Sequence, residues 1–111
     1  MKLLTKQNLR DFERNAKLDE EARKPVVKFF MASGAATWLI SEYDPETGQM
    51  FGLCDLGMGS PELGYVNFNE LKTLTNPYWF GAGIERDRFF EPNGTLAEYA
   101  DKARRDGSIA A

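Results

Sequence analysis

The chain has 111 residues, which predicts a single domain over residues 1–111 with one modest hydrophobic core. Its hydrophobic content of 42%, charged content of 28% and net charge of -3 are typical of a soluble globular protein and disfavour general affinity for phosphate backbones. Because there is no histidine and the only cysteine is Cys54, the sequence excludes Ser-His and Cys-His nucleophiles, internal disulfides and multi-cysteine zinc sites. The N-terminus lacks a signal peptide's apolar run and no stretch is long enough for a membrane helix, so we expect a cytoplasmic protein.

The first predicted element is a helix over residues 6–15. Thr5 is a suitable N-cap, and apolar residues such as Phe12 follow at helical spacing. Basic side chains occupy one face of this helix, at i,i+3 and i,i+4 spacing: Lys6, Arg10, Arg14 and Lys17. Residues 19–24 are polar on all sides, which predicts a solvated turn or a frayed helical piece that Pro25 terminates.

The following segments predict an antiparallel meander. Runs of β-branched and aromatic residues indicate strands, and turn residues separate them. The expected strands occupy residues 26–31, 37–43 and 49–55, with turns at 33–34 and 44–48. We expect Trp38, Phe30 and Leu53 to be largely buried, because each lies in a strand among apolar neighbours. The Cys54 thiol is expected to be buried and inert.

The second half of the chain predicts two more strands and two more helices. A fourth strand is expected at residues 63–66, followed by a short helix capped by Asn67 and a fifth strand in residues 86–90. The last helix begins at Thr95 with a capping box and ends at Gly107. The predicted fold class is therefore α+β, with a single antiparallel β-sheet of about four to five strands packed with an N-terminal and a C-terminal helix.

The charge pattern is uneven along the chain. From Phe29 to Leu71 there is no lysine or arginine, although this block contains several carboxylates. An acidic surface of one sign repels nucleic acid and attracts basic partners. We therefore expect a recognition surface for a basic protein, made from seven carboxylates inside and after this block: Glu42, Asp44, Glu46, Asp55, Glu62, Glu85 and Asp87.

The predicted turns suggest where these carboxylates lie. The first three occur in and beside the turn at residues 44–48, and the next two flank the following loop, so we expect these five to share one end of the meander. No lysine or arginine within the block neutralises them, which leaves a tertiary contact with Arg86 or Arg88 as the alternative. Glu85 and Asp87 alternate with two arginines beside the aromatic loop Tyr78–Phe80, which suggests a binding edge.

Other functions are compatible with the same residues. Glu42, Asp44 and Glu46 can be read as a Mg²⁺ or Ca²⁺ site, although a solvated turn explains them better. Glu42 paired with Glu62 or Glu85 would suit a small carboxylate-dependent hydrolase. The basic first helix would suit a nucleic-acid accessory protein. No residue pattern indicates a cofactor.

Several segments occur in an order that resembles a known family, the domain of unknown function 2958. They are residues 2–6, 26–30, 37–45, 51–53, 61–65, 70–71 and 84–87, with Phe90. The resemblance spans residues 2–92 and implies one compact α+β domain with no assigned activity. The chain departs from it at residues 95–111, where such proteins often end, and at Tyr78–Phe80, which replaces a blander loop. The resemblance also implies genes on plasmids, phages and integrative elements, often near antirestriction functions.

Together these observations favour a non-enzymatic acidic protein-binding domain from a mobile element or phage. An inhibitor of a host defence complex, of the anti-CRISPR or antirestriction type, would act by occupying a basic nucleic-acid-binding surface. The expected partner is a basic protein or nucleoprotein complex, rather than naked nucleic acid or a membrane. We expect the chain itself to be a monomer or a weak homodimer.

Overall fold

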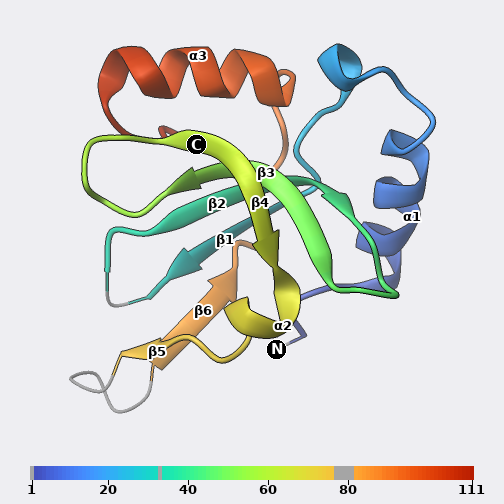
Figure 1. The fold of residues 1–111 in the computed structure, drawn as a ribbon, viewed down its shortest axis with the longest axis horizontal. Helices are drawn as coiled ribbons and strands as arrows, with labels where there is room; N and C mark the ends of the chain where they lie inside the picture. The colour runs from blue at the N-terminus through green and yellow to red at the C-terminus, as the bar shows by residue number, and fades with distance from the viewer. Residues whose placement is uncertain (1, 33, 77–81) are drawn as a thin grey trace.

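A computed structural model of the chain describes residues 2–32, 34–76 and 82–111. The fold is α+β, as predicted, with helices on both faces of an antiparallel sheet (Figure 1). In chain order the elements are α1 (Lys6–Asn15), η1 (Glu20–Ala22), β1 (Val27–Met31), β2 (Thr37–Tyr43), β3 (Gln49–Asp55), β4 (Glu62–Asn67), α2 (Phe68–Leu71), β5 (Thr75–Asn76), β6 (Ala82–Arg86) and α3 (Leu96–Asp106).

The strands lie in the order β4-β3-β2-β1-β6-β5. The first four strands form the predicted antiparallel meander, and β6 then returns to pair with the open side of β1. A five-stranded sheet results, which the two-residue β5 extends beside β6. Within the described residues, no helix is long and apolar enough to cross a membrane.

The fifth long strand was predicted in residues 86–90, but it occupies Ala82–Arg86. The strand ends because Asp87 starts a turn: its carboxylate accepts the Phe89 N–H at 2.9 Å, and its carbonyl accepts the Phe90 N–H at 3.3 Å. A short acidic side chain that bonds to the backbone two residues on stabilises a turn at the expense of a strand. The aromatic pair after Asp87 therefore belongs to a loop.

One face of the sheet, which we call the α1 face, packs against α1 and α2 through aromatic rings. The Phe29 and Phe68 rings are stacked with their centroids 6.1 Å apart. The centroid of the Tyr43 ring lies 5.6 Å from those of both Phe12 and Phe68. Trp38 is 3% exposed in the same cluster. Such ring pairs contribute beyond the apolar area that they bury.

The opposite face, the α3 face, has a smaller core. Here Leu39 and Leu53 pack against a stripe of small and apolar residues on α3, namely Leu96, Ala100 and Ala103. Figure 1 shows α3 and α2 on opposite sides of the sheet. Helix α3 contacts β3 and β4, which leaves the part of this face over β1 and β6 less covered.

The burial predictions are confirmed for Trp38 and Leu53, whereas Phe30 is only partly buried. Successive side chains in a strand point to opposite faces, and Phe29 takes the place in the α1 core, so Phe30 lies half-buried on the α3 face. Cys54 is partly buried, and burial raises the pKa of its thiol to about 11, which agrees with an inert thiol.

Candidate functional site

The structure does not bring the seven predicted carboxylates together. Consecutive hairpins in an antiparallel meander turn at alternate ends of the sheet. The β2–β3 turn therefore places Glu42, Asp44 and Glu46 at one end, and the β3–β4 loop places Asp55 and Glu62 at the other. The expectation that these five share one end of the meander is wrong.

The β2–β3 turn is only partly a free acidic surface. A salt bridge of 2.9 Å joins the Glu42 carboxylate to the Arg23 guanidinium, so a cation from outside the block, and neither Arg86 nor Arg88, neutralises this residue. The Asp44 carboxylate accepts the Glu46 N–H at 2.9 Å and shapes the turn. Asp44 and Glu46 are nevertheless exposed.

Asp55 has a structural position. This residue is only 3% exposed. Its two carboxylate oxygens accept hydrogen bonds from the N–H groups of Gly57 at 2.8 Å and Ile109 at 3.0 Å. These bonds hold the β3–β4 loop and the segment after α3. In this conformation Asp55 is shielded from a partner.

The carboxylate pairs proposed for catalysis are far apart. Glu62 lies two strands away from Glu42 and three residues further along the sheet. At the usual strand spacing and rise, their Cα atoms are about 14 Å apart. Glu85 lies two strands away from Glu42 on the other side and further along the sheet. Their Cα atoms are about 19 Å apart by the same spacing and rise. Glycosidases hold their two carboxylates about 5–9.5 Å apart. Where the chain is described, no group of three or more His, Cys, Asp or Glu residues is arranged to hold a metal ion.

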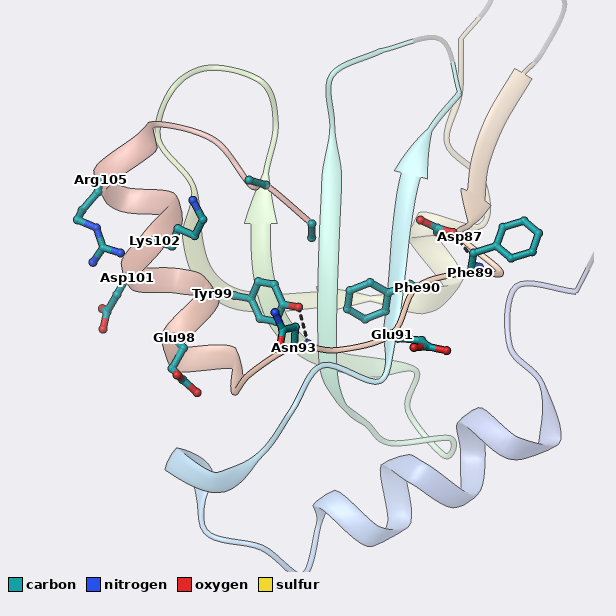
Figure 2. A pocket seen from close by; sticks show the side chains of 12 residues that line it. Asp87, Phe89, Phe90, Glu91, Asn93, Glu98, Tyr99, Asp101, Lys102 and Arg105 are labelled. Atoms are coloured by element: carbon teal, nitrogen blue, oxygen red, sulfur yellow. Dashed lines mark hydrogen bonds between the residues drawn. The ribbon is translucent and has the colours of Figure 1, made fainter.

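A different site lies on the α3 face, between α3 and the loop that follows β6. It is a groove of about 720 Å³ (Figure 2). Twelve residues line it: Asp87, Phe89, Phe90, Glu91, Asn93, Glu98, Tyr99, Asp101, Lys102, Arg105, Ala110 and Ala111. A second cavity of about 540 Å³ over β1 and β6 shares Asp87 and Phe89 with it, so the loop after β6 borders both hollows.

The turn at Asp87 builds the first rim of the groove. The Asp87 N–H donates to the Lys28 carbonyl at 2.9 Å, and the carboxylate lies 3.7 Å from the Lys28 ammonium. The turn directs Phe89 into solvent, where it is 86% exposed, and returns Phe90 to the α3 core. Among the large hydrophobic side chains that the described residues expose, Phe89 is the most exposed, ahead of Met58 at 79% and Tyr65 at 67%.

Helix α3 builds the second rim. Its N-terminus is fixed by the predicted capping box, in which Glu98 N–H donates to Thr95 and Thr95 N–H donates to Glu98. Because one stripe of the helix is buried, the residues outside that stripe face solvent. Figure 2 shows Glu98, Asp101 and Arg105 along this rim.

The two rims are joined at the floor. The Tyr99 hydroxyl accepts the Asn93 N–H at 2.7 Å, and the Phe90 and Tyr99 rings lie 6.4 Å apart (Figure 2). Ala110 and Ala111 line one end of the groove, and the neighbouring Ile109 anchors this segment to Asp55. Hydrogen bonds to the loop, the helix and the tail therefore preorganise the site.

The groove carries more negative than positive charge. Four carboxylates, Asp87, Glu91, Glu98 and Asp101, line the groove with two cations, Lys102 and Arg105. Asp87 is paired with Lys28 at 3.7 Å and Asp101 with Arg104 at 3.0 Å, so the excess of negative charge comes from Glu91 and Glu98. Hydrogen bonds from the Thr95 backbone and hydroxyl lower the pKa of Glu98, so it stays ionised. Lys102 is paired with Asp106 at 2.8 Å, and that hydrogen bond lowers the pKa of the Asp106 carboxyl. A hollow with aromatic walls and a negative rim can hold a cationic ligand.

Sequence reasoning identified one groove residue, Asp87, and the structure places Glu85 on the neighbouring strand β6. It missed Phe89 because the segment was read as a strand, and it missed Glu98 and Asp101 because the polar face of a helix is usually only solvated. The pair Phe89-Phe90 followed by Glu91 was the available sequence signal. The binding edge was predicted at residues 85–88, which the structure describes, whereas the neighbouring loop Tyr78–Phe80 lies outside the described residues.

The family model described as "Protein of unknown function (DUF2958)" matches residues 2–110, and the chain belongs to this family. The match includes α3, so the departure expected at residues 95–111 is corrected: the C-terminal helix is part of the family's domain. No curated protein and no solved structure shows significant similarity to the chain.

Proposed function

We propose that this member of the DUF2958 family is a non-enzymatic protein-binding domain whose groove beside α3 holds a basic segment of a partner protein. The observation that carries the proposal is Phe89, which is 86% exposed at the rim of a hollow that four carboxylates line. Aromatic residues and flanking opposite charges are the features that anchor protein interfaces.

The chemistry of Phe89 favours an arginine as the partner's anchor. The guanidinium carbon of Arg88 already lies 5.6 Å from the centre of the Phe89 ring, which shows that this ring can associate with a guanidinium. Attraction of a cation to an exposed aromatic face contributes about 0.5–1 kcal/mol. A partner's arginine can stack on the opposite face of the ring and reach Glu91 or Asp87 at the same rim.

The charge of the groove favours a particular class of partner. Basic segments that bind phosphate backbones also attract clustered carboxylates, because the same long-range field acts on both. The partner proposed here is therefore a nucleic-acid-binding protein, whose basic surface would be occupied when the complex forms. Inhibition of a host defence complex, of the antirestriction or anti-CRISPR type, is the finer form of this proposal, supported by the gene context that the family resemblance implies.

The test uses a short arginine-rich peptide as a probe and a matched pair of charge-reversal variants. E91K/D101K reverses two groove carboxylates, and D44K/E46K reverses two exposed carboxylates of the β2–β3 turn. Both variants change the net charge equally. Backbone amide NMR maps the peptide on the wild-type protein, and stopped-flow measurements give the association rate of each variant at low salt.

The proposal predicts shift changes concentrated in residues 87–93 and 98–105. It also predicts that E91K/D101K slows association by about tenfold more than D44K/E46K, because electrostatic steering depends on charge near the contact. If the shifts cluster at residues 44–47 and the turn variant has the larger effect, the binding surface is the acidic turn of the sequence-based prediction. Equal effects and dispersed shifts would show that the groove is only solvated surface.

A further inference from the structure

The free edge of the sheet at β4 carries a second interaction surface. β4 is six residues long and ends the strand order, so one side of its backbone has no strand partner among the described residues. The opposite edge, β5, has only two residues. Proteins usually protect a long edge with lysine, proline within the strand, a bulge or a covering element. Glu62–Asn67 contains no lysine or proline, and its pairing with β3 shows no bulge. Helices α2 and α3 contact β4, but no strand pairs with its outer edge among the described residues.

The hydrogen-bond pattern identifies which backbone groups face outward. Phe68 N–H donates to the Gly48 carbonyl at 2.7 Å, and this pair continues the β3–β4 register. In an antiparallel ladder, hydrogen-bonded pairs recur at every second residue. Glu62, Gly64 and Val66 therefore point their N–H and C=O groups toward β3, and Leu63 and Tyr65 point theirs outward.

The outward-facing residues are also exposed apolar side chains. Leu63 is exposed at the edge, and Tyr65 is 67% exposed although its ring is held edge-on to Phe51 at 5.0 Å. The neighbouring β3–β4 loop exposes Leu56 and Met58 as well. The edge thus presents unpaired backbone groups and apolar side chains in one place.

We propose that two copies of this chain pair antiparallel through β4, with Gly64 facing Gly64 on the twofold axis. In this register Leu63 of each copy lies opposite Tyr65 of the other, and the two residues exchange N–H···O=C bonds in both directions. Gly64 then forms the close, non-hydrogen-bonded pair, where Cα atoms approach to about 4.5 Å.

The proposed register places no like charges opposite one another. The only charged residue of β4 is Glu62, which lies opposite Val66 of the second copy rather than opposite Glu62. Like charges directly opposite one another would destabilise the pair, and this register avoids them. The side chain of Asn67 is not needed, since it already bonds to Thr47 and Asn69.

Disulfide trapping tests the register. A Cβ at Gly64 would meet no atom within 4 Å, so Gly64→Cys leaves the monomer undisturbed. The expected Cα separation of about 4.5 Å lies within the range of about 4.4–6.8 Å that a disulfide spans. Both cysteine variants are made in a Cys54→Ser background, because Cys54 lies directly opposite Glu62 in the same chain and could form an intramolecular disulfide with a cysteine there. Under mild oxidation Gly64→Cys should give a covalent dimer, whereas Glu62→Cys, which faces Val66 of the second copy, should not.

Sedimentation velocity provides the second measurement. The wild type should shift from monomer to dimer as its concentration rises, and L63K/Y65K should remain monomeric because like charges then face each other across the axis. F89A should dimerise as the wild type does, which separates this proposal from the function proposed for the groove. A wild type that stays monomeric up to millimolar concentration, or trapping no greater for Gly64→Cys than for Glu62→Cys, overturns the inference.

Discussion

The two faces of the sheet use similar residues for different purposes. On the α1 face, the rings of Phe12, Phe29, Tyr43 and Phe68 contact one another and are covered by helices. On the α3 face, Phe90 and Tyr99 are only partly covered, and Phe89 stands in solvent beside carboxylates. The first arrangement buries aromatic surface for stability, and the second leaves it available to a partner.

This difference explains why a ring-rich composition does not by itself mark a binding protein. The number of helices over each face decides how the rings are used. α1 and α2 cover one face, whereas α3 contacts only part of the other. Mutations on the α1 face should therefore lower the stability of the fold, and mutations of exposed residues on the α3 face should weaken binding.

The largest expected effect is on the α1 face. Trp38→Ala should lower the free energy of unfolding by about 3–5 kcal/mol, since it leaves a cavity in the aromatic core. Phe30→Ala, on the half-buried α3 face, should cost about 1–2 kcal/mol. Urea denaturation measures both variants, and equal losses would contradict the contrast between the faces.

The next effect concerns Asp55, which links the sheet to the tail that bounds the groove. Asp55→Ala should destabilise the fold by about 1–3 kcal/mol, because it leaves two N–H donors without their acceptor. Asp55→Asn retains one carbonyl oxygen and should cost less. Hydrogen exchange at the Ile109 amide should accelerate in the alanine variant. Unchanged exchange there would show that Asp55 does not hold the tail.

Thr95→Ala should destabilise α3 by about 1 kcal/mol, and Thr95→Ser should retain most of the cap. The pKa of Glu98 is lowered from 4.5 by its bonds to Thr95. A lowered folded-state pKa contributes stability above the unfolded value and loses it as the pH falls through the folded value. The difference between wild type and Thr95→Ala should thus shrink in acid. A melting-temperature difference that stays constant from neutral to acidic pH would argue against the capping box.

The smallest expected effect on stability is that of Phe89→Ala, within about 0.5 kcal/mol of the wild type, because the ring is almost entirely in solvent. Thermal denaturation checks this expectation. A loss comparable with that of Trp38→Ala would place Phe89 in the core and remove the basis of the proposed site.

Local signals predicted much of the fold. The bounds of α1, β2 and β3, the Thr95 capping box and the stop at Gly107 follow from caps, alternation and turn residues near in sequence. The pairing of β6 with β1 and the half-exposure of Phe30 depend on contacts between distant segments, so the sequence did not reveal them.

The candidate site was predicted less well for the same reason. Asp87 was identified from its charge, but the groove forms only when the loop after β6 approaches α3 through the Asn93–Tyr99 bond. Grouping the carboxylates of 42–46 with Asp55 was an avoidable error, because consecutive hairpins of the predicted meander turn at alternate ends of the sheet.

The most direct test of the central claim compares two exposed aromatic residues. An arginine-rich peptide is titrated by calorimetry into wild type, Phe89→Ala and Tyr65→Ala at low salt. Phe89 borders the groove and Tyr65 does not, although both are largely exposed. Loss of a cation–aromatic contact of about 0.5–1 kcal/mol predicts about two- to fivefold weaker binding for Phe89→Ala and no change for Tyr65→Ala. Equal affinity for all three proteins would contradict the assignment of the groove as the binding site.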